Sequence, residues 1–383
     1  MQDQALLKKK LMNVVRYAVE HYPPIKKLYL ENSIDIEHCE FEKLPFINKH
    51  SLNGFSYENS IAVPQSEIVR VFTTSGTTGS PSYVSFTQKD WDRQIRLLEQ
   101  TFIDVGFDKS DLFYDMVPRS TIFAAYVALS AAERTGVAVF PAGQCEIEVH
   151  VKYIRDLKPT ILNGLAFFVV KLGEALPLEC RARVKILCLI GEFIFESIRK
   201  KLKDLFPNAI VTSGYGISEV LALNGCSCLD GFHYDENEFF VEVANPDENG
   251  VGELVFTNLN SMAMPLVRYK CGDIGRIIDT PCSCGNTHKR FDVLGRIDDF
   301  VNVKGKLLNV GALQKFVYAI RGIVAACCVY FPSIDSRFEL HYDGNIDETQ
   351  ARVDIKRIFD VTPIFVKGMD CESQWKKTFF RIV

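Results

Sequence analysis

The sequence lacks the features that mark membrane-spanning and nucleic-acid-binding proteins. It has no uninterrupted apolar run of the ~18 residues that a membrane-spanning helix requires. Its 44 lysines and arginines do not outnumber its 48 aspartates and glutamates, so no basic excess attracts nucleic acid or an anionic membrane. Residues 1–22 have apolar positions at helical spacing but no continuous signal-peptide core. We therefore expect a cytoplasmic protein with no membrane span and no nucleic-acid partner.

The chain contains twelve cysteines, but nothing in the sequence indicates a disulfide scaffold. Without a secretory signal the thiols should stay reduced, because a cytosolic redox poise opposes disulfide formation. Seven of the cysteines stand singly or in apolar surroundings, where a free cysteine usually packs as a small hydrophobic residue. We assign no role to these seven, which are Cys39, Cys145, Cys180, Cys188, Cys327, Cys328 and Cys371.

Internal repeats, low-complexity tracts and disordered linkers are also missing, and the patterning alternates between helices and strands. With 383 residues, the chain is long enough for a large domain and a small one. Helical stretches that alternate with short apolar runs are typical of helix-covered, mostly parallel sheets. The helical stretches are residues 4–22, 90–105, 121–135 and 193–205, and the apolar runs are residues 137–140, 161–163, 184–190 and 209–211.

The texture changes after residue 239, where short strand-like pieces are separated by turn residues. This pattern predicts an antiparallel, barrel-like and β-rich appendage over about residues 235–295. The last part of the chain alternates strand-like and helix-like pieces, as expected for a small α+β domain. The predicted fold class is therefore α/β, with a large N-terminal domain over residues 1–297 and a small, mobile C-terminal domain over residues 298–383.

One hydroxyl- and glycine-rich loop, between Thr73 and Pro81, is typical of a phosphate cradle. Its glycines let a backbone approach a polyanion closely, and its hydroxyl side chains add hydrogen-bond donors. These residues are Gly76 and Gly79, and Ser75, Thr77 and Thr78. The spacing differs from that of the common nucleotide-binding motif, which ends in a Lys-Ser or Lys-Thr pair. Taken alone, the loop also fits a polar turn between two strands.

Three further segments give this loop a context. They are Tyr215-Gly216-Ile217-Ser218-Glu219, Arg268-Tyr269-Lys270-Cys271-Gly272-Asp273 and Gly295-Arg296-Ile297-Asp298-Asp299. In order and separation they resemble the Y-G-x-[ST]-E, R-Y-x-x-G-D and G-R-x-D-D segments of the adenylate-forming enzymes, the superfamily of acyl-CoA synthetases, adenylation domains and luciferases. Because no lysine follows Pro81, and because of Phe86-Thr87-Gln88-Lys89-Asp90, the chain is most similar to the phenylacetate-CoA ligase branch. Residues 264–269 and 282–285 strengthen this narrower resemblance.

The resemblance implies a ligase that uses ATP and Mg²⁺. The nucleotide would be held by Ser75, Gly76, Thr77, Thr78, Gly79, Gly191, Glu192, Tyr215, Gly216, Ser218, Asp273 and Arg296. In this set the loop would hold the β- and γ-phosphates, Tyr215 would stack on adenine, and Asp273 would bind both ribose hydroxyls. Glu219 would coordinate Mg²⁺, for which a carboxylate is a suitable ligand. Arg268 fits a ligand contact and a structural salt bridge equally well.

The resemblance assigns catalysis to Thr78, Glu219 and a lysine near the C-terminus. Lys377 is the favoured lysine and Lys376 is the alternative beside it. The alternative to a catalytic role is that both lysines form a solvated charge pair before a final apolar strand.

Conformational change is also implied by the resemblance. Asp298 would be the pivot about which the C-terminal domain rotates between adenylation and thioester formation. After this rotation, Lys304 and Gly305 would line the tunnel that admits the thiol.

Two cysteine-rich places predict a structural zinc site. One is the Cys-x-Cys of residues 282–284, and the other is the Cys-Ser-Cys of residues 226–228, which a histidine follows. Zn²⁺ prefers tetrahedra of such thiolate and imidazole ligands. Some relatives in the phenylacetate-CoA ligase branch carry a Cys/His set at these two places. We assign Cys226, His233, Cys282 and Cys284, with Cys228 as the substitute for Cys226 and His288 as the substitute for His233.

The sequence therefore predicts that ATP activates a carboxylic acid to an acyl-adenylate, and that coenzyme A then takes the acyl group, with release of AMP and pyrophosphate. The acyl pocket should lie between residues 123–126, 164–168 and 214–215, whose apolar and aromatic lining suits an aryl or medium-sized acid. A carrier-protein or protein thiol stays open as the acceptor. A degenerate, non-catalytic nucleotide-binding protein stays open as a different class of function, and a homodimer is kept as an assembly hypothesis.

Overall fold

The computed structural model divides into two compact units. The first consists of Met1–Ser110, Arg119–Val139 and Gly214–Leu294, and the second of Asp111–Pro118, Phe140–Ser213 and Gly295–Val383. The structure describes residues 2–52, 55–73, 82–119, 123–191, 194, 196–225, 228, 230–297, 300–303, 306–320, 322–332, 337–368 and 380–382. The division into domains of residues 1–297 and 298–383 stays a prediction.

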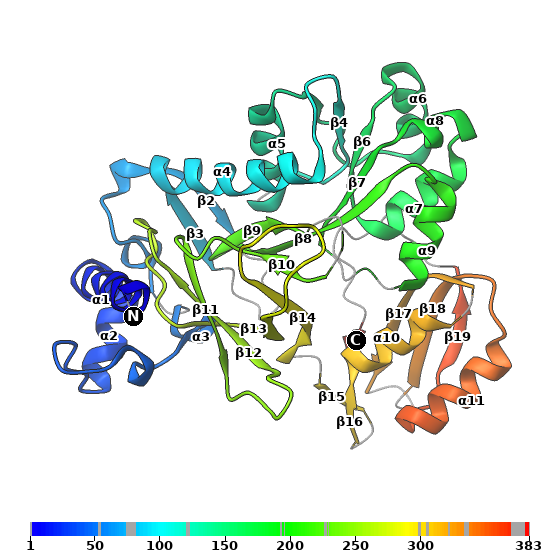
Figure 1. Ribbon diagram of the computed structural model, residues 1–383. Helices are drawn as coiled ribbons and strands as arrows, with labels where there is room; N and C mark the ends of the chain where they lie inside the picture. Colours follow the sequence, from blue (N-terminus) through cyan, green and yellow to red (C-terminus); the bar gives the residue numbers. More distant parts are fainter. Residues whose placement is uncertain are drawn as a thin grey trace. The chain divides into compact units, whose positions relative to one another are not determined.

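Two helices that meet at a proline begin the first unit (Figure 1). α1 (Gln2–His21) buries one apolar stripe that includes Leu11, Val15 and Ala18, as the helical spacing predicts. α2 (Pro23–Glu31) begins with a proline, whose fixed φ suits the first helical position. Short helical turns follow at Phe41–Lys43, Lys49–Leu52 (α3), Tyr57–Ser60 and Gln65–Glu67.

α4 (Gln88–Val105) is fixed at its N-terminus by a capping box. Thr87 Oγ1 accepts the backbone N–H of Asp90, and an Asp90 carboxylate oxygen accepts the N–H of Thr87, each at 3.1 Å. The same carboxylate accepts the N–H groups of Met262 and Ala263, each at 2.9 Å. Asp90 therefore ties the start of this helix to a distant loop of the same unit.

β2 (Ile68–Thr73) and β3 (Tyr83–Thr87) form an antiparallel ribbon on either side of the glycine-rich loop. Thr73 pairs with Tyr83, so the ribbon brings the two ends of the loop together, while residues 74–81 lie outside the described residues. Beside the ribbon, aromatic rings of β2, β3, α4 and α5 (Phe123–Thr135) pack together with centroid distances of 5.1–6.2 Å. The loop thus starts and ends on paired strands whose buried aromatic rings pack together.

The predicted β-rich appendage is a sheet of mostly antiparallel strands in the first unit. Its strand order is β10-β14-β13-β12-β11, with β1 added to β13 in the parallel sense. The strands are β1 (Ile47–Asn48), β10 (Phe232–His233), β11 (Phe239–Ala244), β12 (Gly252–Asn258), β13 (Tyr269–Ile278) and β14 (Arg290–Arg296). In the part of the chain that is described, β10 and β11 stand at the two ends of this order. The last two residues of β14, Gly295 and Arg296, already belong to the second unit.

A parallel sheet lies at the centre of the second unit. Its strands are β4 (Leu112–Asp115), β6 (Ile161–Gly164), β7 (Ile186–Leu189) and the first half of β8 (Ile210–Ile217), paired in that order. The helices between them are α6 (Ile147–Leu157), α7 (Ala166–Ala175), α8 (Leu178–Arg183) and α9 (Glu196–Leu205), and β5 (Ala138–Phe140) precedes α6. β6 and β7 are buried at every position, which fits a sheet covered on both faces.

β8 is longer than the predicted run of residues 209–211, because glycine and hydroxyl residues hide its second half from an apolar pattern. That half belongs to the first unit, where Gly214 pairs with Asn224 of the antiparallel β9 (Leu221–Asn224). β8 therefore carries the Tyr215 to Glu219 segment out of the parallel sheet and into a hairpin.

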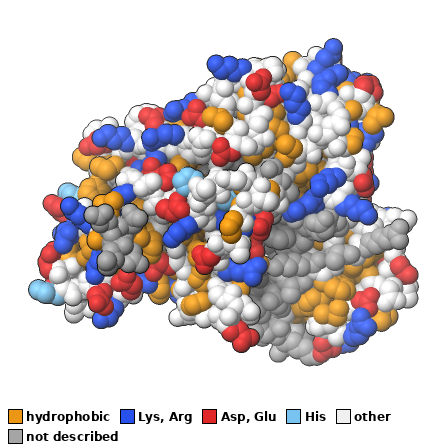
Figure 2. Space-filling model, viewed as in Figure 1, with side chains coloured by type: hydrophobic (Ala, Val, Ile, Leu, Met, Phe, Trp, Pro, Cys, Tyr) orange, Lys and Arg blue, Asp and Glu red, His pale blue; other side chains and the backbone are white. Residues whose placement is uncertain are grey.

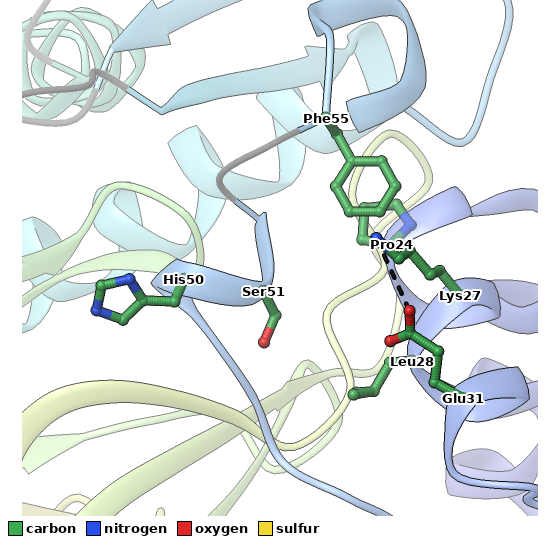
Figure 3. A pocket seen from close by; sticks show the side chains of 7 residues that line it. All are labelled: Pro24, Lys27, Leu28, Glu31, His50, Ser51 and Phe55. Atoms are coloured by element: carbon green, nitrogen blue, oxygen red, sulfur yellow. Dashed lines mark ion pairs between the residues drawn. The ribbon is translucent and has the colours of Figure 1, made fainter.

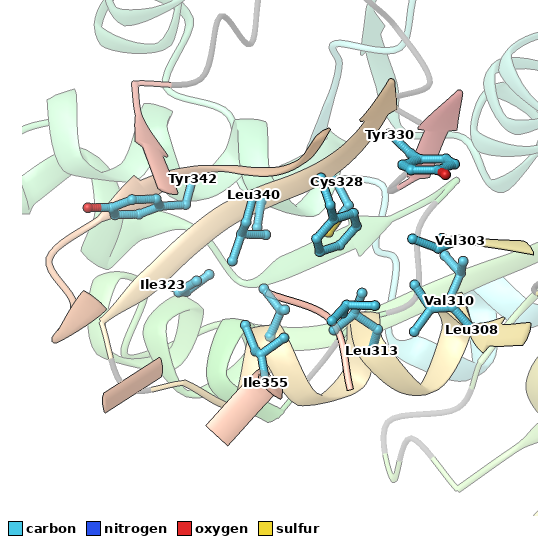
Figure 4. Packing of buried hydrophobic residues seen from close by; sticks show 14 residues of the cluster. Val303, Leu308, Val310, Leu313, Ile323, Cys328, Tyr330, Leu340, Tyr342 and Ile355 are labelled. Atoms are coloured by element: carbon cyan, nitrogen blue, oxygen red, sulfur yellow. The ribbon is translucent and has the colours of Figure 1, made fainter. Parts of the chain in front are cut away.

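The end of the chain has the predicted α+β pattern. A hairpin of β15 (Phe300–Val303) and β16 (Lys306–Asn309) comes first, followed by a sheet in the order β19-β18-β17-β20. The elements are α10 (Val310–Ala319), β17 (Ile323–Phe331), β18 (Arg337–Gly344), α11 (Glu348–Phe359), β19 (Ile364–Lys367) and β20 (Phe380–Ile382). Leu313 and Ile355 of the helices pack with Cys328 and Leu340 of the sheet in one buried core (Figure 4).

The distribution of charged side chains and the hydropathy of the described helices agree with what the composition predicts. Figure 2 shows acidic and basic side chains interspersed over the face in view. Among the described helices, none combines the length and the apolar character needed to cross a bilayer. Four of the cysteines predicted to be core residues are buried, namely Cys180, Cys188, Cys327 and Cys328, while Cys39 and Cys145 are half-buried and Cys371 lies outside the described residues.

Candidate functional site

Two of the sequence motifs meet in the first unit, where β8 and β13 place Tyr215 beside Asp273. The Tyr215 hydroxyl donates to Asp273 Oδ2 at 2.7 Å. The Tyr215 ring lies 5.2 Å from the Phe232 ring and 5.4 Å from the Phe291 ring, so aromatic packing fixes its orientation. Asp273 is only 5% exposed. The carboxylate predicted to bind ribose is thus buried and already held on one oxygen.

The protonation of Tyr215 follows from the same geometry. Burial, and then the Asp273 charge, raise the pKa of Tyr215 well above its ordinary value. The phenol therefore remains a hydrogen-bond donor at neutral pH. The Cys271 thiol completes the surroundings, since its Sγ lies 3.7 Å from Asp273 Oδ2 and 3.4 Å from the carbonyl oxygen of Leu254.

Glu219 stands in the turn between β8 and β9, and its charge acts on two buried tyrosines. Burial, followed by the Glu219 charge, raises the pKa of Tyr269. Burial, followed again by the Glu219 charge, also raises the pKa of Tyr22, at the end of α1. Within the described part of the structure, the Tyr22 hydroxyl is a buried polar atom without a hydrogen-bond partner. These two phenols were not predicted from the sequence as site residues.

The other residues of the Tyr215 to Glu219 segment belong to the β8–β9 hairpin. Gly216 pairs with Ala222, and Ser218 is in the turn. The side-chain amide of Gln94, on α4, donates to the carbonyl oxygen of Val220 at 2.9 Å. This buried hydrogen bond fixes the turn to α4.

Arg268 has a structural role in the described residues. Its guanidinium is bonded to the Glu242 carboxylate at 3.0 Å and donates to the carbonyl oxygens of Glu42 and Leu44. It also lies 4.3 Å from the centroid of the Phe46 ring. Of the two readings kept open from the sequence, these contacts favour the structural salt bridge.

The first unit also brings together three of the four predicted zinc ligands. The ligand atoms of His233, Cys282 and Cys284 all lie within 4.8 Å of one another. His233 Nε2 is 3.4 Å from Cys284 Sγ. Imidazole and thiolate are the ligand types of structural Zn²⁺ sites, so the donors present fit such an ion.

The two substitute ligands do not join this cluster in the part of the chain that the structure describes. Cys226 lies outside the described residues, and Cys228 Sγ is 3.1 Å from the Ser283 hydroxyl. His288 does not share the cluster of the two cysteines, because its Nδ1 faces Glu236 Oε2 at 2.7 Å. The geometry therefore favours His233 over His288.

The turn that carries the two thiols is held from several sides. Gly285 adopts a φ of +82°, which favours glycine, and its N–H donates to the Cys282 carbonyl oxygen at 3.2 Å. The Asn286 N–H donates to Cys284 Sγ at 3.4 Å. The buried guanidinium of Arg290 donates to the carbonyl oxygens of Thr280, at 2.9 Å, and of Asp230, at 2.7 Å. Arg290 thus connects this turn to the segment that follows Cys228.

Gly191 and Arg296 are the predicted nucleotide residues that lie in the described part of the second unit. Gly191 follows β7 with a φ of +78°, and Arg296 is the exposed last residue of β14. The remaining predicted positions lie outside the described residues: Ser75, Gly76, Thr77, Thr78, Gly79, Glu192, Asp298, Lys304, Gly305, Lys376 and Lys377. Their roles stay predictions.

The acyl pocket predicted from the sequence also stays a prediction. In the first unit the Phe123 and Tyr126 rings pack against Phe72, and in the second the Phe168 ring lies 5.3 Å from the His150 ring. A different cavity, of about 180 Å³, is found beside α2 and α3 (Figure 3). Its lining is Pro24, Lys27, Leu28, Glu31, His50, Ser51 and Phe55, and it includes none of the predicted site residues.

Comparisons with known proteins agree with these observations. The family model described as AMP-binding enzyme matches residues 18–242, which is 225 of the 383 residues. A phenylacetate-coenzyme A ligase of Thermus thermophilus is 28% identical over 381 residues, which cover 93% of this chain and 82% of that protein. A phenylacetate-coenzyme A ligase of Escherichia coli is 24% identical over 377 residues, which cover 92% and 82%.

A solved structure shows the fold. The crystal structure of a 2-hydroxyisobutyryl-CoA ligase in the postadenylation state has a TM-score of 0.83 and 20% identity, and the match covers 98% of this chain and 88% of that one. The α/β fold class predicted from the sequence is confirmed. The resemblance to the phenylacetate-CoA ligase branch and the enzyme class of AMP-forming acid–thiol ligases are confirmed as well. The chain belongs to the family of AMP-binding enzymes, in its phenylacetate-coenzyme A ligase-like branch.

Proposed function

We propose that this protein activates an aryl or medium-sized carboxylic acid with ATP and transfers the acyl group to coenzyme A. The observation that carries the proposal is the meeting of two motifs in the first unit, where the Tyr215 hydroxyl donates to Asp273 Oδ2 and the charge of Glu219 acts on Tyr269. Relatives named as coenzyme A ligases over most of the chain support the same reaction.

The chemistry proceeds in two displacements. In the first, a carboxylate oxygen of the acid attacks the α-phosphorus of ATP, and the bond to pyrophosphate breaks. In the second, the sulfur of coenzyme A attacks the acyl carbon, the thiol proton is lost, and AMP leaves. Phosphoryl transfer of this kind depends on positioning and on charge stabilisation rather than on covalent catalysis by the protein.

Asp273 and Glu219 would act on different parts of the nucleotide. Asp273 presents a fixed carboxylate that accepts hydrogen bonds from the ribose hydroxyls, since a charged acceptor strengthens such bonds. Glu219 would hold Mg²⁺, which supplies positive charge to the phosphate oxygens when bound.

A structural zinc site belongs to the same proposal. His233, Cys282 and Cys284 would supply three ligands, and Cys226 or Cys228 would supply the fourth. The ion would join β10 to the turn before β14. Reduced thiols agree with a cytoplasmic location, which we also propose.

Carboxylate-dependent exchange of pyrophosphate into ATP tests the function. The purified protein would be assayed with Mg²⁺ and a panel of aromatic, heteroaromatic and short aliphatic acids, without a thiol. Exchange with at least one acid is expected and would name the substrate class. Nucleotide binding without exchange for any acid would contradict the proposal.

The acceptor is tested separately. With the acid identified, thioester formation would be followed with coenzyme A and with a phosphopantetheine-bearing carrier protein as a control. Thioester with coenzyme A alone is the expected result, and transfer only to the carrier would overturn this part of the proposal.

A further inference from the structure

The carboxylate of Glu236 holds a short segment just before β14 with both of its oxygens. Glu236 Oε1 accepts the backbone N–H of Lys289 at 2.8 Å, and Oε2 accepts from His288 Nδ1 at 2.7 Å. The Tyr234 N–H also contacts this segment, because it donates to the Lys289 carbonyl oxygen at 3.0 Å. Residues 288 and 289 are therefore fixed against the residues that directly follow β10.

The same segment fixes the tautomer and the orientation of the His233 ring. The His288 carbonyl oxygen lies 2.8 Å from His233 Nδ1. A carbonyl oxygen can only accept, so Nδ1 must carry the proton and donate. The other ring nitrogen, Nε2, then has a free lone pair in the neutral imidazole, and it is Nε2 that faces Cys284 Sγ at 3.4 Å. This is the tautomer and the ring orientation that a metal ion at His233, Cys282 and Cys284 requires.

We propose that Glu236 is a positioning residue for the metal site and that it acts through the backbone carbonyl of His288 on the tautomer of His233. The inference rests on the zinc site proposed above and names a residue outside its ligand set. Its physical basis is that an imidazole fixed in the binding tautomer before the ion arrives loses less freedom on binding.

Glu236 could instead be read as a ligand of a second ion, because Asp235, Glu236 and His288 also bring three ligand atoms within 4.8 Å. Both oxygens of Glu236 are already occupied by the N–H groups of Lys289 and His288. A cation there would face two donors that point at the same carboxylate. Support of His233 accounts for the contacts without an additional ion.

Zinc affinity measured on the full-length protein tests the inference. The apo-protein, prepared with a chelator under reducing conditions, would compete with a chromogenic chelator for Zn²⁺. Glu236→Ala should weaken the affinity by about 10- to 100-fold, the range found when such supporting groups are removed. Glu236→Gln, which keeps an oxygen for the Lys289 N–H, should fall between this variant and the wild type. Glu248→Ala, at an exposed position of a distant turn, is the matched control and should bind as the wild type does.

A second variant separates the carbonyl from the ring. His288→Ala removes the imidazole but keeps the backbone carbonyl and the Lys289 N–H, so it should retain most of the affinity. Absorption of the Co²⁺-substituted protein adds a readout other than affinity, because loss of the His233 ligand would change the cobalt bands.

The outcomes distinguish the two proposals. Wild-type protein that binds no Zn²⁺ would overturn the metal site and this inference with it. Wild-type protein that binds Zn²⁺, together with a Glu236→Ala variant of unchanged affinity and cobalt spectrum, would overturn the inference alone. A His288→Ala variant as defective as one lacking His233 would also overturn it, because the ring would then be a ligand.

Discussion

Tyr215 and Asp273 form the polar contact on which nucleotide binding is expected to depend. Removing the hydroxyl in Tyr215→Phe leaves an oxygen of a buried carboxylate without this donor. Hydrogen bonds to charged groups contribute about 1.5–3 kcal/mol, so the variant should lose stability of this order in urea unfolding and bind ATP more weakly. Tyr153→Phe is the control, because the Tyr153 ring packs against Phe140. Equal stabilities of the two variants would show that the hydroxyl of Tyr215 contributes nothing.

Glu219 is the residue whose substitution should separate binding from chemistry. Glu219→Gln keeps the size of the side chain but removes the charge that Mg²⁺ requires. We expect pyrophosphate exchange to fall by at least about 100-fold, the scale of losing one electrostatic contact in a transition state. Nucleotide binding without Mg²⁺, measured by calorimetry, should change little. Exchange at the wild-type rate would remove Glu219 from the mechanism.

At the scale of elements, the capping box is what fixes α4 against the loop at residues 262–263. Thr87→Ala removes the oxygen that accepts the Asp90 N–H, and such caps contribute about 1 kcal/mol. The expected result is a loss of this size in the free energy of unfolding, with the circular dichroism of the folded protein unchanged. Gln88→Ala, at the exposed next position, should be nearly neutral. A neutral Thr87→Ala would mean that Asp90 alone maintains the helix start.

The β10 to β14 part of the appendage is the element that metal removal should loosen. Zinc bound by His233, Cys282 and Cys284 stabilises only the folded state, by about 4 kcal/mol when free zinc is 1,000 times the dissociation constant. Chelation should therefore lower the midpoint of thermal unfolding, and added Zn²⁺ should restore it. Hydrogen exchange should accelerate at β10 and β14 first. In the control, the same chelator should have no effect on a variant that carries both Cys282→Ser and Cys284→Ser. A wild-type protein whose unfolding midpoint stays the same on chelation would contradict the prediction.

At the scale of the whole molecule, His150 predicts how stability depends on pH. His150 is fully buried between the Tyr114 hydroxyl, at 2.8 Å, and Cys145 Sγ, at 3.2 Å, and burial lowers its pKa to about 4. In the unfolded chain the histidine pKa is about 6.5, so as the pH falls the unfolded state binds a proton before the folded state does. The contribution of neutral His150 to the free energy of unfolding is therefore complete above pH ~6.5 and is lost towards pH 4.

The loss should amount to about 2 kcal/mol between pH 7 and pH 5. Urea unfolding at the two pH values measures it, and His150→Gln should remove this part of the dependence. If the variant and the wild type lose the same stability, another group is responsible.

Much of the molecule could be predicted from the order of its residues because the signals are local. A helix such as α4 is encoded by its own periodicity and cap, and the strands β6 and β7 by apolar runs between turns. The second half of β8 was missed, because Gly214 and Gly216 interrupt the apolar pattern although the strand continues through them. Family membership was equally accessible, because each motif is a contiguous segment.

Contacts between distant residues could only come from the folded chain. The Glu219 charge acts on Tyr22 and Tyr269 although both are far from it in sequence, and nothing near Tyr22 marks it as part of a site. The choice of His233 over His288 likewise depends on which histidine the pairing of β10 with β14 turns towards the two cysteines. Side-chain direction is set by strand register and by hydrogen bonds to backbone carbonyls, which are properties of paired segments and not of either segment alone.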